Sequence, residues 1–127
     1  MSAGLYALTV RSTFAAAHFL REYAGNCERM HGHNWRVEVT VESPVLDDRG
    51  IALDFREIKA ALNGLLSRFD HRCLNDVPPF DGKNPSSENL ALHLFEELAK
   101  TVPPPARVAR VAVWESDDAR AEYSRPA

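Results

Sequence analysis

The chain has 127 residues, of which 45% are hydrophobic, and it carries a formal net charge of −3 at pH 7. This length fits a single domain over residues 1–127, and the apolar share is that of an ordinary globular domain. The acidic balance argues against nucleic acid as a partner, and the apolar stretches are too short to span a membrane. Two cysteines cannot form a disulfide framework, and residues 1–4 lack a signal-peptide pattern, so we expect a cytoplasmic protein with free thiols.

The first half of the chain predicts two long strands. Residues 5–19 place apolar side chains on one side of an extended backbone, and His18 continues that side. Residues 34–42 alternate more clearly between apolar and polar side chains, and His31 and His33 continue the apolar side. If the two strands form a hairpin, the three imidazoles meet at one end of its buried face.

The second half predicts two helices followed by two strands. Asp54 and Glu57 form the start pattern of a helix, and the apolar residues after them have helical spacing. A loop over residues 75–85 precedes a second helix, which either Ser86 or Ser87 caps. The two strands are expected at residues 107–115 and 121–124.

This order of elements predicts an α+β fold. Two strands, two helices and two strands suggest an antiparallel four-stranded sheet that carries both helices on one face. A sheet of four strands has two exposed edges, and pairing between copies of the chain would cover them. We therefore expect an oligomer.

His18, His31 and His33 are the candidate ligands of a metal ion. Each continues an apolar pattern, where an unpaired imidazole would be costly to bury. Three neutral imidazoles with a vacant fourth position are typical of a catalytic zinc site, whereas structural zinc sites have four protein ligands. The pattern places no carboxylate beside them that would suggest the iron site of two histidines and one carboxylate.

Cys27 lies four residues before His31, in a predicted turn beside the expected metal ion, where a thiolate would be favoured. Asp70 and His71 could supply its proton partner, because an acid–histidine pair fixes the tautomer of the ring and raises its basicity. Spacing alone gives a catalytic Cys27 and a small buried cysteine equal weight. Glu115 ends a strand beside two aspartates, and this pattern alone favours a solvated strand end.

Several motifs occur in the order seen in the 6-pyruvoyltetrahydropterin synthase and 6-carboxytetrahydropterin synthase (QueD) family, which the chain resembles over essentially its whole length. The motifs are Phe14-Ala15-Ala16-Ala17-His18, Cys27-x3-His31-Gly32-His33, Leu53-Asp54-Phe55, Asp70-His71-x-x-Leu74-Asn75, Asn84-Pro85-Ser86-Ser87-Glu88-Asn89 and Trp114-Glu115. The resemblance implies a tunnelling fold (T-fold), a ββααββ unit that forms trimers whose sheets make a barrel. It further implies a hexamer of two stacked trimers, with active sites between subunits.

The resemblance also implies the roles of the site residues. It assigns zinc to His18, His31 and His33, catalysis to Cys27, Asp70 and His71, and pterin binding to Glu115, Ser86 and Ser87. For Glu115 this replaces the strand-end interpretation, because a carboxylate can accept hydrogen bonds from the adjacent ring N–H and amino group of a pterin. The two serines stand where threonine is more usual, so they keep the hydroxyl and lose a methyl contact.

The short spacing between Cys27 and His31 resembles the carboxy-forming branch, which serves the synthesis of queuosine and other deazapurines. The implied reaction converts 7,8-dihydroneopterin triphosphate to 6-carboxy-5,6,7,8-tetrahydropterin and releases acetaldehyde and triphosphate, with zinc as the cofactor. The alternatives within the family are a pyruvoyl-forming synthase and a related enzyme that cleaves the pterin side chain. A non-catalytic metal-binding module and a metal-free cysteine hydrolase would each leave Glu115 and residues 84–88 without a purpose.

Overall fold

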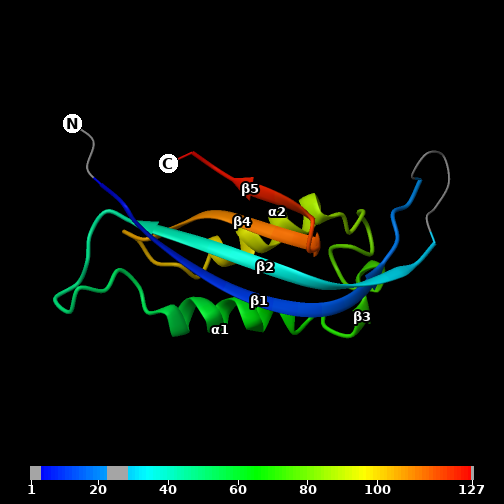
Figure 1. Ribbon diagram of the computed structural model, residues 1–127, viewed down its shortest axis with the longest axis horizontal. Coiled ribbons are helices and arrows are strands. Elements are labelled where there is room, and N and C mark those ends of the chain that lie inside the picture. Colours follow the sequence, from blue (N-terminus) through cyan, green and yellow to red (C-terminus); the bar gives the residue numbers. More distant parts are fainter. Residues whose placement is uncertain (1–3, 23–28, 127) are drawn as a thin grey trace.

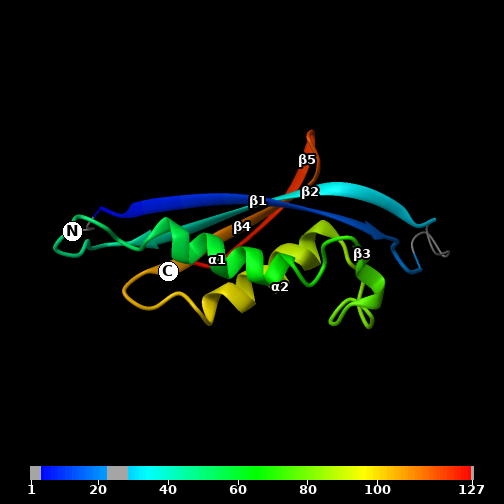
Figure 2. The same cartoon turned by 90° about the horizontal axis from the view of Figure 1, so that it is seen from below.

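The computed structural model describes residues 4–22 and 29–126, which form one sheet and two α-helices (Figure 1). The strands are β1 (Tyr6–His18), β2 (His31–Ser43), β3 (Arg72–Cys73), β4 (Arg107–Ser116) and β5 (Ala119–Ser124). The helices are α1 (Phe55–Leu66) and α2 (Ser87–Ala99), and a 3₁₀ turn spans Leu74–Asp76. The strand order is β3-β1-β2-β4-β5, and both helices lie on one face of the sheet (Figure 2). The predicted α+β architecture is confirmed.

β1 and β2 pair antiparallel along their whole length without a shift in register. Tyr6 lies opposite Ser43 at one end, and His18 lies opposite His31 at the other. Alternate side chains of both strands enter the core, and in β2 the fully buried ones are Trp35, Val37, Val39 and Val41. The pairing continues through His33 to His31, as the extension of the second strand's apolar side predicted.

The two helices begin where the sequence predicts. Asp54 caps α1 by accepting a hydrogen bond from the backbone N–H of Arg56, and Ser86 caps α2 by accepting from the N–H of Asn89. Such caps satisfy amides that have no partner inside the helix. The helices contribute a buried apolar face to the core that the sheet completes, and its members include Ile58, Leu62, Leu90, Leu94 and Leu98. No helix in the described part of the chain is long and apolar enough to cross a membrane.

The sheet contains a fifth strand, β3, that the sequence does not predict. β3 pairs in parallel with Ala16 and Ala17 of β1, so the expected count of four strands covers only β1, β2, β4 and β5. His71 directs the chain onto this edge: it has a positive φ of 59°, and its N–H donates to the carbonyl of Ala15 at 2.6 Å. A two-residue strand carries no hydrophobic alternation, so periodicity cannot reveal it.

Leu94→Ala tests the core between α2 and the sheet. Leu94 is fully buried, and its truncation is expected to lower the free energy of unfolding by roughly 2–5 kcal/mol through lost burial and a cavity. Val45→Ala is the control, because Val45 is exposed and surface truncations usually change stability by less than about 0.5 kcal/mol. Urea denaturation of the two variants and the wild type measures both values, and equal midpoints would contradict the assigned core.

Candidate metal centre and its surroundings

The three predicted histidines meet at one end of the β1–β2 pair. The register places His18 opposite His31 and Ala16 opposite His33, so all three side chains share the face that carries Trp35. The Nε2 atoms of His18 and His31 are 3.0 Å apart. The three rings pack edge to face, with centroids 4.6–5.1 Å apart. The convergence expected from strand parity is confirmed.

Backbone carbonyls fix the orientation of two of these rings. The Nδ1 atom of His18 lies 2.8 Å from the carbonyl oxygen of Pro85, and Nδ1 of His31 lies 2.9 Å from that of Arg29. A carbonyl can only accept, so Nδ1 carries the proton in each ring and a neutral ring presents the lone pair of Nε2. Two such lone pairs 3.0 Å apart repel each other. A cation between them removes the repulsion, which is the usual situation of metal-ligating histidines.

The third ring, His33, has a lowered pKa, which favours its neutral form. Burial is the largest cause of its lowered pKa; the Glu115 carboxylate opposes the shift, and His18 and His31 add to it. Its buried Nε2 faces Oε1 of Glu115 at 2.9 Å and makes no hydrogen bond to any other described residue. A neutral imidazole nitrogen is the form that binds a metal ion.

Glu115, at the end of β4, brings a carboxylate into the same cluster. Its Oε1 atom lies 2.9 Å from Nε2 of His33, 3.6 Å from that of His18 and 3.8 Å from that of His31. The interpretation of Glu115 as a solvated strand end is therefore wrong. The expected vacant fourth position is also not what the structure shows, because this carboxylate lies where a fourth donor would be.

The donor set fits a tetrahedral metal ion. The donor atoms of His18, His31, His33 and Glu115 all lie within 4.8 Å of one another. Three imidazole nitrogens and one carboxylate oxygen are ligands that zinc accepts, with bonds of about 2.0–2.2 Å. Two of the nitrogens already have the required tautomer, and the third lies 2.9 Å from the Glu115 carboxylate that would share the ion. The residues present therefore form a candidate zinc site.

A clamp centred on Arg21 holds the loop that supplies the Pro85 carbonyl. The guanidinium donates to the backbone carbonyls of Lys83, Asn75 and Phe80. The backbone N–H and C=O of Arg21 both bond to the side-chain amide of Asn84, the residue before Pro85. Sequence patterns did not single out Arg21, and they gave Asn84 only as part of a motif, because the partners of both are mostly backbone groups whose positions depend on the folded loop.

Arg21→Ala is expected to weaken metal binding without touching a ligand. Loss of the clamp frees the Pro85 carbonyl, and loss of such an orienting partner typically lowers metal affinity by about 10–100-fold. A competition titration between the protein and a coloured chelator for Zn²⁺ measures the change. Arg49→Ala removes an exposed arginine that pairs only with Asp47 among the contacts described, and it should leave the affinity unchanged. Equal affinities for both variants would contradict the positioning role.

Asp70 and His71 form the predicted acid–histidine pair, at the outer edge of β1. Nδ1 of His71 lies 3.0 Å from Oδ2 of Asp70, and Oδ1 of Asp70 accepts from the backbone N–H of Ala15 at 2.9 Å. That backbone hydrogen bond is the main cause of the lowered pKa of Asp70, and His71 adds to it. The side chain of His71 is 81% exposed.

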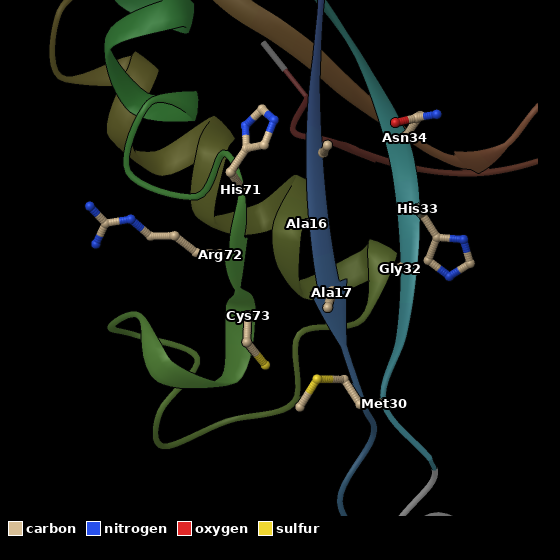
Figure 3. Close-up of a pocket in the computed structure, with 10 residues that line it drawn as sticks. Ala16, Ala17, Met30, Gly32, His33, Asn34, His71, Arg72 and Cys73 are labelled. Carbon is tan, nitrogen blue, oxygen red and sulfur yellow. The ribbon is translucent and has the colours of Figure 1, made fainter.

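An open pocket of about 530 Å³ is lined by both His71 and His33. Figure 3 shows their rings pointing away from each other, with β1 and β2 between them. The pair is therefore formed as predicted, but within one chain its imidazole does not face the metal ligands.

The structure describes the two predicted serines but not the predicted catalytic cysteine. Cys27 lies outside the described residues. The hydroxyl oxygen of Ser86 accepts from the N–H of Asn89 at 3.1 Å as the cap of α2, and Ser87 is buried in the first turn. Cys73 is half-buried, and its thiol lies 3.8 Å from the side-chain oxygen of Asn75.

The fold and the cluster define a small α+β protein with a candidate catalytic metal centre at one end of a strand pair. The sequence matches the 6-pyruvoyl tetrahydropterin synthase family over residues 7–126, and the chain belongs to this family. It is 35% identical over 116 residues to an Archaeoglobus fulgidus protein provisionally named a 6-carboxy-5,6,7,8-tetrahydropterin synthase, covering 91% of this chain and 93% of the relative. It is 32% identical over 108 residues to the dihydroneopterin monophosphate aldolase of Pyrococcus furiosus, covering 85% and 88%.

The structure is similar to that of the 6-pyruvoyl tetrahydropterin synthase of Caenorhabditis elegans. The TM-score is 0.84, the sequence identity is 23%, and the alignment covers 99% of both chains. This likeness confirms the expected T-fold. The family match makes the chain a pterin-processing enzyme of the lyase kind.

Proposed function

We propose that this enzyme is a zinc-dependent 6-carboxy-5,6,7,8-tetrahydropterin synthase. It would convert 7,8-dihydroneopterin triphosphate to 6-carboxy-5,6,7,8-tetrahydropterin and release acetaldehyde and triphosphate. The observation that carries the proposal is the convergence of His18, His31 and His33 with their metal-binding nitrogens turned toward one another. The short spacing from Cys27 to His31 and the name of the Archaeoglobus relative support the carboxy product. The proposal includes a cytoplasmic location and a role in queuosine or other deazapurine synthesis.

His18, His31 and His33 would hold the zinc ion at the end of the strand pair. When bound, zinc supplies a Lewis acid that lowers the pKa of the hydroxyl groups on the substrate side chain. Cys27, as a thiolate, would remove a proton from that side chain. His71, oriented by Asp70, would return a proton to the pterin.

Glu115 would hold the pterin ring by accepting hydrogen bonds from its ring N–H and amino group. Orientation of this kind places the reacting carbon within reach of the base. Ser86 and Ser87 would add hydroxyl contacts at the start of α2. The oxygen of Ser86 already accepts from the N–H of Asn89, so its O–H remains available to donate to the ring.

The active site would be completed between copies of the chain. His71 is exposed at the β1 edge and faces away from the metal ligands of its own chain. It would therefore contribute to the active site of an adjacent copy. β3 covers β1 only at Ala16 and Ala17, and β5 forms the other edge, so both edges can pair with a second copy. A barrel-shaped trimer, stacked as a hexamer, follows from such pairing in this family.

The decisive experiment is incubation of the zinc-loaded protein with 7,8-dihydroneopterin triphosphate and identification of the product by mass. The carboxytetrahydropterin, together with acetaldehyde, would support the proposal. A pyruvoyl product would assign the chain to the other synthase branch. An aldol-type cleavage is the second candidate, favoured by the similarity to the Pyrococcus aldolase, and it would leave a different pterin. Turnover that survives removal of zinc by a chelator would exclude the proposed chemistry.

A further inference from the structure

The position of Glu115 points to a second task for the residue assigned to the pterin ring. We propose that its carboxylate is the fourth donor of the metal site while no substrate is bound, and that it leaves the site when a pterin ring arrives. The residue would thus close the metal site at rest and open it in response to the correct ring. This inference rests on the proposed function, since it needs both the zinc ion and a pterin substrate.

The distances within the cluster place the Glu115 carboxylate at the position of a fourth metal ligand. Donor atoms around a tetrahedral ion with bonds of about 2.0–2.1 Å are separated by roughly 3.3–3.4 Å. The separations from Oε1 of Glu115 to the three Nε2 atoms are 2.9, 3.6 and 3.8 Å, and the two Nε2 atoms of His18 and His31 are 3.0 Å apart. These values scatter on both sides of the tetrahedral separation. The carboxylate therefore lies where a fourth ligand belongs.

The charges around Glu115 also favour a cation between its carboxylate and the imidazoles. The Nδ1 atoms of His18 and His31 donate to backbone carbonyls, so in the neutral tautomer that these bonds select, each Nε2 directs its lone pair at the carboxylate. An anion facing lone pairs is repelled unless a cation lies between them. Other glutamates of the sheet have a different environment, because Glu38, Glu42 and Glu122 each pair with arginine. Among the described residues, the ion pairs of Glu115 are all with imidazoles.

The exposure of Glu115 allows its side chain to leave the metal site. Its side chain is 37% exposed, at the strand end before the exposed Ser116, so it has solvent on one side into which it can rotate. A pterin edge offers two adjacent N–H donors, which match the two oxygens of one carboxylate. Coordination of a metal ion occupies one carboxylate oxygen, so the carboxylate can no longer offer both oxygens to the two N–H donors of the pterin. Binding of the ring therefore competes with coordination, and Glu115 exchanges one for the other.

Cobalt(II) replaces zinc in the test, because its visible absorption reports the number and kind of ligands. Glu115→Ala removes a direct donor, so it is expected to lower the affinity for Zn²⁺ by at least the roughly 10–100-fold that loss of an orienting partner costs, and to change the cobalt bands. Glu115→Gln, which keeps the shape of the side chain, should give an intermediate loss and serves if the alanine variant is unstable. Asp117→Asn removes an exposed carboxylate two residues away and should change neither quantity.

Pterin without a side chain is the second probe, since it has no hydroxyl with which to reach the metal ion. Its addition to the cobalt-loaded wild type should shift the bands toward those of Glu115→Ala, and it should leave that variant's bands unchanged. Unaltered Zn²⁺ affinity and cobalt bands in Glu115→Ala would overturn the inference while leaving the proposed function intact. A wild-type protein that binds neither metal would overturn the proposed function itself.

Discussion

His33→Ala is expected to yield a folded protein that no longer retains zinc. One of three imidazole donors is lost, and the effect should exceed the 10–100-fold typical of an orienting partner, so we expect an affinity loss of at least about 100-fold. Turnover should disappear with the metal. His33 is only half-buried near the start of β2, so its truncation should leave the circular dichroism spectrum unchanged. Zinc content after dialysis, measured by mass spectrometry, and chelator competition report the loss.

His71→Ala is the matched control for this variant. His71 is a histidine at the same end of the sheet, but its ring is exposed and pairs with Asp70. The variant should keep one zinc ion per chain while losing turnover. If His33→Ala retained zinc as tightly as the wild type, the assignment of the metal site would be wrong. If His71→Ala lost zinc, the proposed division between ligands and proton-transfer groups would be wrong.

Cys27→Ala is expected to bind zinc as the wild type does and to lose turnover. A positioned general base typically contributes about 10²–10⁴-fold to the rate, and an alanine cannot accept a proton. The measurement is kcat at saturating dihydroneopterin triphosphate, with zinc occupancy matched between the two proteins. Cys73→Ala provides the control, because this half-buried thiol has no assigned role and its removal should leave kcat close to the wild-type value. Full activity in Cys27→Ala would refute the assignment of the base.

Strand parity predicted the central feature of the site. The alternation through Trp35 to Val41 is long and regular, so it fixed which face of β2 is buried and therefore where His31 and His33 point. The same reasoning, applied to β4, could have placed Glu115. Val111 and Val113 are buried, and Glu115 continues their side of the strand, but the two aspartates after it suggested a solvated end.

Other parts of the site depend on contacts that sequence patterns do not encode. The carbonyl of Pro85 orients His18, and the guanidinium of Arg21 orients the loop. Every residue has a backbone carbonyl, so the residue type does not indicate which carbonyls make these contacts. β3 is too short for periodicity, so the edge position of Asp70 and His71 emerged only from the fold. The roles of Cys27 and of the two serines rest on family resemblance.

His18 and His31 lie at the two ends of the segment that joins β1 to β2, and this placement has a consequence for the stability of the protein. A cation held by both joins the last residue of β1 to the first residue of β2, as a removable cross-link. A ligand that binds only the native chain adds about 4 kcal/mol when present at a thousand times its dissociation constant. Native domains are stable by only about 5–15 kcal/mol, so metal scarcity would enlarge the unfolded population that proteases degrade. Cellular metal supply would then set the abundance of this enzyme as well as its activity.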